Sequence, residues 1–278
     1  GMALMRTNGW AALLIAAVLL AVVLRKQNRL LVKVLLAVLV LSWVMIGPVL
    51  KSMNVPGTDP VEAFAVPMQQ IARVVANGRE LTQEQQTLMG EIFLMDKLGE
   101  AYDPQTVDPV KYETFRYDLV DYIRQNAGKY VRLYLSLGLR YPGDYLKAWI
   151  DETRGYWNGG YAYWIYTLQT EENILGIIQP EGANLLARLY GAWFRFAEKP
   201  TALQPLYSIG LQVWILIACC VLCALQGRKQ WLIAVPALVL TLGLWLGTPV
   251  YAEFRYAYPM MLCAPLVLMA TLFESKEE

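Results

Sequence analysis

The stretch that decides the fold is residues 231–250, WLIAVPALVLTLGLWLGTPV, which contains no charged side chain. A helix needs about 20 mainly apolar residues to cross the hydrocarbon core of a bilayer. Further apolar runs occupy residues 10–24, 34–50, 207–225 and 258–273. We therefore predict a mainly α, polytopic membrane protein with about five transmembrane helices.

Composition supports a membrane protein and excludes several kinds of chemistry. Of the 278 residues, 56% are hydrophobic and only 17% are charged, and the mean hydropathy is +0.35. The absence of histidine excludes His-based catalytic triads and His metal ligands. The four cysteines lie in apolar runs, so we expect neither disulfides nor a metal site. A net charge of +1 argues against nucleic acid as a partner.

Basic residues between the apolar runs predict the topology, because Lys and Arg in short loops stay in the cytoplasm. They lie between the first two runs and between the third and fourth, at Arg25, Lys26, Arg29, Lys33, Arg228 and Lys229. The first run could be a secretory signal peptide, but no small-residue cleavage site follows it. We expect the N-terminus and residues 51–206 outside, and the C-terminal tail in the cytoplasm.

The predicted organisation has three parts. Residues 1–50 hold two transmembrane helices, residues 51–206 form a largely helical extracytoplasmic domain, and residues 207–278 hold three more spans and a short cytoplasmic tail. Within the domain, Pro67 suits the first turn of a helix, and Thr82 with Gln85 forms a capping-box pattern. Further helices are predicted near residues 118–125, 129–139, 144–153 and 183–196.

An aromatic-rich segment at residues 141–166 is the first candidate for ligand binding. Flat aromatic faces beside polar groups suit stacking against sugar rings. The candidates for contact with a sugar or acceptor are Asp144, Trp149, Arg154, Tyr156 and Trp157. The alternative is that these aromatics pack the domain or form a belt at the membrane surface. The turn residues 158–160, between aromatic flanks, also predict a small hairpin.

Two other segments suit an anionic lipid headgroup. Gln69, Gln70 and Arg73 follow a predicted helix start, where free backbone N–H groups favour an anion. The alternative is an ordinary helix start with a solvated arginine.

The second of these segments precedes the last apolar run and contains Glu253, Arg255 and Tyr256. An arginine at a membrane surface suits a lipid phosphate because of its planar fork of donors. The alternatives are that Glu253 pairs with Arg255 and that the tyrosine is a belt residue. We predict all six residues of the two segments as carrier-phosphate contacts.

Several motifs resemble a known family. They are PMQQIARVV at 67–75, YDP at 102–104, DPVK at 108–111, YPGDYLKAW at 141–149 and TRGYW at 153–157. Together they look like a family of uncharacterised bacterial polytopic membrane proteins, which resembles the GT-C glycosyltransferases, the group that includes protein O-mannosyltransferases. The resemblance covers most of the chain. Arg255-Tyr256, followed by Pro259, is similar to the Arg-Tyr element before a late span in many GT-C enzymes.

The resemblance implies an activity and a location. It implies transfer of a sugar from a polyprenyl-phosphate carrier to a glycan or protein acceptor at the outer face of a bacterial plasma membrane, with no cofactor. GT-C enzymes carry a catalytic acidic residue in the first outer loop, after an N-terminal span, and nothing before Trp10 matches it. We therefore expect this chain to be the C-terminal portion, partnered by an N-terminal half of the same protein, and we assign no catalytic residue.

A second hypothesis needs no catalytic acid. In it, the chain is a non-catalytic, membrane-anchored module that binds a glycan or a protein during assembly of the cell envelope. Membrane lipid is a partner in both hypotheses.

Overall fold

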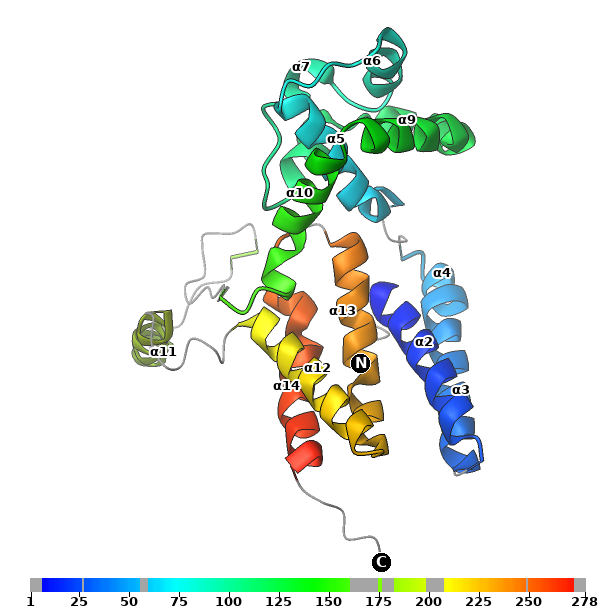
Figure 1. The fold of residues 1–278 in the computed structure, drawn as a ribbon, viewed down its shortest axis with the longest axis vertical. Helices are drawn as coiled ribbons and strands as arrows, with labels where there is room; N and C mark the ends of the chain where they lie inside the picture. Colours follow the sequence, from blue (N-terminus) through cyan, green and yellow to red (C-terminus); the bar gives the residue numbers. More distant parts are fainter. Residues whose placement is uncertain are drawn as a thin grey trace, which may run out of the picture.

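The chain is mainly α-helical in the computed structural model (Figure 1). The structure describes residues 7–26, 28–55, 60–160, 175–176, 183–198, 208–248 and 250–272. Apolar helices stand side by side in the lower half of Figure 1, and a cluster of shorter helices lies above them. We call residues 60–153, which make up this cluster, the helical domain.

The apolar helices coincide with the apolar runs of the sequence. They are α2 (Thr7–Leu24), α3 (Arg29–Val44) with its continuation through η1 (Met45–Val49) and α4 (Leu50–Ser52), α12 (Ile209–Leu225), α13 (Val235–Gly247) preceded by η7 (Lys229–Ala234), and α14 (Phe254–Leu272). Within the described residues, three stretches are long and apolar enough to cross a membrane: Arg29–Ser52, Lys229–Gly247 and Phe254–Leu272. Helices α2 and α12 are shorter, so their crossing stays a prediction.

The apolar helices pack as a bundle whose centre is formed by α12, α13 and α14 (Figure 1). Ile209 and Leu216 of α12 are buried with Met260 and Val267 of α14. Helix α2 packs against α13 on one side and α3 on the other. Large apolar side chains of α3 stay exposed, as expected for a surface in lipid.

Arg228 ties the bundle together at the end away from the helical domain. It lies in the turn between α12 and η7, and its guanidinium donates to the carbonyl oxygens of Ala270 and Thr271, at 2.9 and 2.8 Å. These carbonyls are in the last turn of α14, where a helix leaves its C=O groups without intrahelical donors. The positive charge also suits the negative end of the helix dipole.

The helical domain is built around α5 (Ala65–Ala76) and α10 (Pro142–Thr153), which pack against each other. The other elements are η2 (Pro60–Phe64), α6 (Gln83–Gly90), α7 (Met95–Leu98), η3 (Val110–Thr114), η4 (Tyr117–Leu119), α8 (Val120–Gln125), α9 (Ala127–Arg140) and η5 (Arg154–Tyr156). Met68, Ile71 and Ala72 of α5 are buried against Leu133 and Leu137 of α9. The domain thus has a core of its own.

Local sequence signals predict most of these elements. The Thr82 capping box is confirmed: the hydroxyl of Thr82 accepts from the Gln85 amide at 3.2 Å, and the Gln85 side chain accepts from the Thr82 amide at 3.0 Å. Helix α5 begins at Ala65, two residues before Pro67, because proline is tolerated throughout the first turn of a helix. The predicted later helices correspond to α8, α9, α10 and α11 (Ala183–Glu198).

The predicted hairpin is wrong in its first half. Tyr156 closes the 3-10 turn η5 instead of lying in a strand, because the turn continues the end of α10. The second half of that hairpin lies outside the described residues.

Candidate functional site

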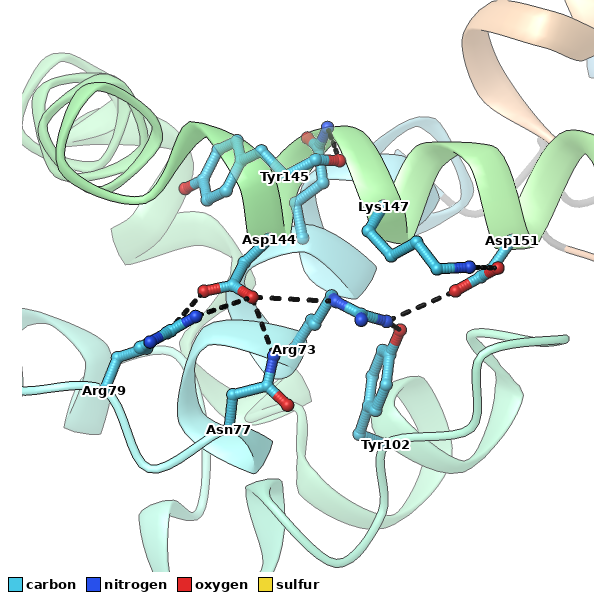
Figure 2. Close-up of polar contacts among 9 residues, drawn as sticks. Arg73, Asn77, Arg79, Tyr102, Asp144, Tyr145, Lys147 and Asp151 are labelled. Atoms are coloured by element: carbon cyan, nitrogen blue, oxygen red, sulfur yellow. Dashed lines mark hydrogen bonds and ion pairs between the residues drawn. The ribbon is translucent and has the colours of Figure 1, made fainter.

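A polar network joins α5 to α10 (Figure 2). Arg73 of α5 donates from Nη1 to Asp151 at 3.3 Å and to the Tyr102 hydroxyl at 2.9 Å, and its Nε lies 3.8 Å from Asp144. Lys147 also contacts Asp151. Both carboxylates are buried, and each is balanced by at least two donors.

Asp144 is the centre of one half of this network. Its carboxylate accepts from Arg79 Nε and from Asn77 Nδ2, both at 2.7 Å (Figure 2). These bonds stabilise the charged form, so the Arg79 hydrogen bond lowers the pKa of Asp144 despite its burial. Asp144 therefore binds α10 to the end of α5, and the fold alone accounts for its position.

The two glutamines of α5 also have partners within the domain. Gln70 donates to the Tyr145 carbonyl at 3.1 Å and accepts from the Tyr134 hydroxyl at 2.5 Å. Gln69 is fully buried and donates to the Asp103 carbonyl at 2.6 Å, but its Oε1 has no hydrogen-bond partner among the described residues. These contacts do not test whether the glutamines or Arg73 bind a carrier phosphate, which stays a prediction.

The end of α10 and the segment that follows reach the apolar helices. We call the contact of residues 149–158 with residues 245–248 and 250–256 the junction. Trp149 Nε1 donates to the Trp245 carbonyl at 2.6 Å, and the backbone amide of Gly155 donates to the Tyr251 carbonyl at 2.8 Å. The Thr248 hydroxyl donates to the hydroxyl of Tyr156, which is fully buried, at 3.3 Å.

Arginines lie on both sides of the junction. The guanidinium of Arg154 lies over the Tyr251 ring, 5.5 Å from its centre, in a cation–π arrangement. Arg255, in the first turn of α14, lies 3.6 Å from Glu253 and stacks over Tyr256. Its side chain is 69% exposed, so a ligand can reach it.

Trp157, predicted to contact a sugar, lies between α10 and α12. Its Nε1 donates to the Thr153 hydroxyl at 3.1 Å, and its carbonyl accepts from Trp214 at 2.6 Å. Its side chain is half-buried. These contacts place Trp157 at the junction with Arg154 and Tyr156. Asp144 lies near the start of α10, in the network with Arg79 (Figure 2).

Glu152, in the aromatic-rich segment, is not among the predicted site residues, but its surroundings are unusual. Its side chain is fully buried, and both carboxylate oxygens lack a hydrogen-bond partner in the part of the chain that the structure describes. Burial raises the pKa of Glu152 well above its usual range. A helical spacing of three and four residues puts Glu152 on the buried face of Tyr145 and Ala148, and this was the available signal.

The predicted site residues therefore fall into two connected groups. Gln70, Arg73 and Asp144 belong to the interface of α5 and α10, and Gln69 of α5 bonds to the Asp103 carbonyl beside it. Trp149, Arg154, Tyr156, Trp157, Glu253, Arg255 and Tyr256 belong to the junction or its rim. Asp151 and Glu152 lie between the groups, in the last turn of α10. The described residues contain no cluster of three Cys, Asp or Glu side chains that could hold a metal ion.

The fold and composition define a mainly α-helical membrane protein with a helical domain resting on its apolar helices. The chain belongs to the family described as "Family of unknown function (DUF6020)", whose model matches residues 1–278. No curated protein and no solved structure matches the chain.

Proposed function

We propose that this chain is the C-terminal part of an integral membrane glycosyltransferase that uses a polyprenyl-phosphate-linked sugar at the outer face of the plasma membrane. In this proposal residues 51–206 lie outside and the apolar helices α2 and α12 also cross the membrane. The acceptor is a glycan or a protein. The observation that carries the proposal is the buried carboxyl of Glu152 beside the junction, whose oxygens have no hydrogen-bond partner among the described residues.

Unpaired buried polar atoms are rare in folded proteins, and each one calls for an explanation such as a ligand or a catalytic role. The carboxyl of Glu152 lies one turn beyond Trp149, which bonds to the end of α13. Gln69 Oε1 and Trp245 Nε1 are also buried and without hydrogen-bond partners among the described residues. They come from α5 and α13, which contact each other. Sugar hydroxyls are ligands that both donate and accept, so they suit such atoms.

The chemistry of glycosyl transfer matches these side chains. A bond forms between an acceptor oxygen and the anomeric carbon, while the bond from that carbon to the carrier phosphate breaks. The proton of the acceptor hydroxyl passes to an ionised carboxylate, and a buried, neutral carboxyl can take this role once opening of the site admits water and lowers its pKa. The departing phosphate takes up negative charge that an arginine can stabilise. We assign the first role to Glu152 and the second to Arg255.

Arg255 suits the phosphate because of where it lies. Arg255 lies in the first turn of α14, one of the helices long enough to cross a membrane, and its guanidinium is exposed. A phosphate at the surface of a bilayer would meet it at that depth. Glu152 is buried, so the acceptor reaches it only when the junction opens.

The test is a transfer assay with the full natural protein in proteoliposomes, supplied with polyprenyl-phosphate sugars. We expect Arg255→Ala and Glu152→Gln to abolish transfer, while Arg124→Ala, which removes an exposed arginine of α8, leaves it intact. Normal turnover of Arg255→Ala at normal expression would remove Arg255 from the site. Normal turnover of Glu152→Gln would remove the proposed proton acceptor.

A second candidate is a non-catalytic module that binds a glycan or protein in envelope assembly. The polar network favours it, since Asp144 and Asp151 are both paired with the basic side chains Arg73, Arg79 and Lys147. Binding of envelope glycans to the purified chain, lost in Trp157→Ala and retained in Tyr112→Ala, would support this module. Glycan binding without any transfer by the full natural protein would favour it over the enzyme.

A further inference from the structure

Helix α11 divides its surface into an apolar face and a basic face. Six large apolar side chains are all exposed, by 49–66%: Leu185, Leu186, Leu189, Tyr190, Trp193 and Phe196. At 3.6 residues per turn they fall within about 140° of the helix circumference. The exposed side chains of Arg188 and Arg195 lie on the opposite side.

Such a distribution is costly in water and favourable at the surface of a bilayer. Helices with leucine and aromatic residues on one face and Lys or Arg on the other lie in the membrane plane, with the apolar face about 5–10 Å below the headgroups. Tyr190 and Trp193 suit that depth, because their rings are amphipathic. The arginines stay in the headgroup region, where lipid phosphates balance their charge.

The surrounding fold puts α11 within reach of that surface. Residues 199–208 lead from its end to the start of α12 and can extend at most about 35 Å. The start of α12 lies at the end of the bundle near the helical domain, since the Ser208 hydroxyl donates to the Gly159 carbonyl at 2.9 Å. In Figure 1, α11 is seen end-on beside the apolar helices, which run lengthwise up the page.

We propose that α11 lies in the plane of the membrane and that the lipid leaflet on the side of the helical domain covers its apolar face. Its apolar face enters the boundary of the acyl chains, and its arginines face the headgroups. The helix lies across the direction of the membrane-spanning helices and does not cross the bilayer. This inference rests on α11 alone and holds whichever function the junction has.

The experiment measures the depth of single spin labels on the full chain in nanodiscs of phosphatidylethanolamine and phosphatidylglycerol. The background replaces the four native cysteines with alanine, namely Cys219, Cys220, Cys223 and Cys263. Labels go on Leu189→Cys for the apolar face and Arg195→Cys for the basic face. Leu246→Cys, on α13, is the reference for lipid, and Tyr112→Cys, on the helical domain, is the reference for water.

We expect the Leu189 label to resemble the Leu246 label, with access to a water-soluble nickel chelate reduced roughly tenfold below that of the Tyr112 label and oxygen access kept. The Arg195 label should resemble the Tyr112 label. Equal nickel access on both faces of α11 would place the helix in water and overturn the proposal. Loss of access to both nickel and oxygen at Leu189 would show a protein partner there, and would also overturn it.

A second measurement keeps the native cysteines. Lipids brominated near the headgroup quench tryptophan fluorescence, and the difference between the wild-type chain and Trp193→Phe isolates Trp193. We expect this difference signal to be quenched in brominated liposomes. An unquenched Trp193 would contradict the in-plane helix even if the cysteine-free chain failed to fold.

Discussion

At Gly155 the turn η5, which follows the helical domain, comes into backbone contact with the segment that leads into α14. A Cβ atom placed there would lie 2.2 Å from the Ala252 Cβ and 2.5 Å from the Tyr251 carbonyl oxygen. The same carbonyl accepts the Gly155 amide proton. Only glycine therefore allows the 3-10 turn after α10 to lie flat against this segment.

Gly155→Ala should loosen the junction. The added methyl group meets backbone atoms, so something must shift, and overpacking of this kind costs about 1–3 kcal/mol. Gly128→Ala is the control: its Cβ meets nothing within 4 Å, and alanine in a helix is favoured over glycine by up to about 1 kcal/mol. Thermal unfolding in detergent should show a lower Tm for the first variant only. Equal Tm values would mean that the junction is not held by this contact.

The buried carboxyl of Glu152 makes a contribution to the free energy of unfolding that decreases as the pH rises. Burial raises the pKa of Glu152 in the folded chain, whereas an unfolded glutamate ionises near pH ~4.3. This term is fully present below the unfolded pKa, because the folded carboxyl is neutral and easily buried there. It is lost between the unfolded and the folded pKa, by at most about 1.4 kcal/mol for each pH unit.

Glu152→Gln, which is neutral at every pH, should therefore gain stability relative to the wild type as the pH rises above ~4.3. Chemical unfolding of both chains across a pH series measures the difference. Glu113→Gln, which removes an exposed carboxyl, is the matched control. A difference between Glu152→Gln and the wild type that does not change with pH would show that Glu152 is not buried in its neutral form.

Among single residues, the sequence predicts those whose partners are close along the chain. Thr82 and Gln85 are three positions apart, so their capping box could be predicted from the local pattern. Arg73 and Asp151 are 78 positions apart, and no local pattern predicts their contact. The helical spacing puts Glu152 on the buried face of α10, but its lack of hydrogen-bond partners among the described residues follows only from how the domain packs.

Between the elements of the helical domain, the most extensive packing is that of α5 against α10. Asp144 receives hydrogen bonds from Asn77 and Arg79, just beyond the end of α5, and Arg73 lies at the other side of the same carboxylate. The network thus fixes how the two helices are rotated against each other. The apolar periodicity predicts that both helices bury a face, but not which polar residues meet across it.

Asp144→Asn should weaken this link. The substitution removes the negative charge that Arg73 and Arg79 pair with and replaces one acceptor oxygen by an NH2 group, and we expect a loss of about 1–3 kcal/mol in the free energy of unfolding at neutral pH. The Arg79 bond lowers the pKa of Asp144, so this stabilisation is present above the unfolded pKa, near ~3.9, and is lost as the pH falls through the folded pKa.

Denaturant unfolding at pH 7 and in acid measures the effect. The variant and the wild type should differ at pH 7 and converge in acid, while Asp121→Asn, at an exposed aspartate of α8, matches the wild type at both. A constant difference at all pH values would contradict the charge-based explanation.

At the scale of the whole molecule, the two largest hydrophobic cores among the described residues are separate. One lies in the helical domain, within residues 61–145, and the other unites Tyr156 with α12, α13 and α14. The apolar runs predicted the helices of the second core within a few residues, because a membrane demands long apolar stretches. The way the domain rests on those helices depends on distant contacts, such as that between Trp149 and Trp245, and could not be predicted.

Because the helical domain has a hydrophobic core of its own, we expect it to fold without the apolar helices. We expect residues 60–153, produced alone, to be helical by circular dichroism and to unfold cooperatively. A fragment of residues 60–140 is the control, since it lacks α10 and with it Tyr145, Asp144 and Asp151. It should unfold without a cooperative transition. An unstructured fragment 60–153 would show that the domain requires the membrane part for its fold.

The contact of Arg228 with the end of α14 also has a consequence for biosynthesis. The carbonyl oxygen of Ala270 follows Arg228 by 42 positions in the chain, so their hydrogen bond can form only after the last helix has left the ribosome. Until then the turn that carries Arg228 has no such acceptor from α14. Insertion of α14 must thus precede this contact, and a chain that stops translation before Ala270 would lack both acceptors, the carbonyl oxygens of Ala270 and Thr271.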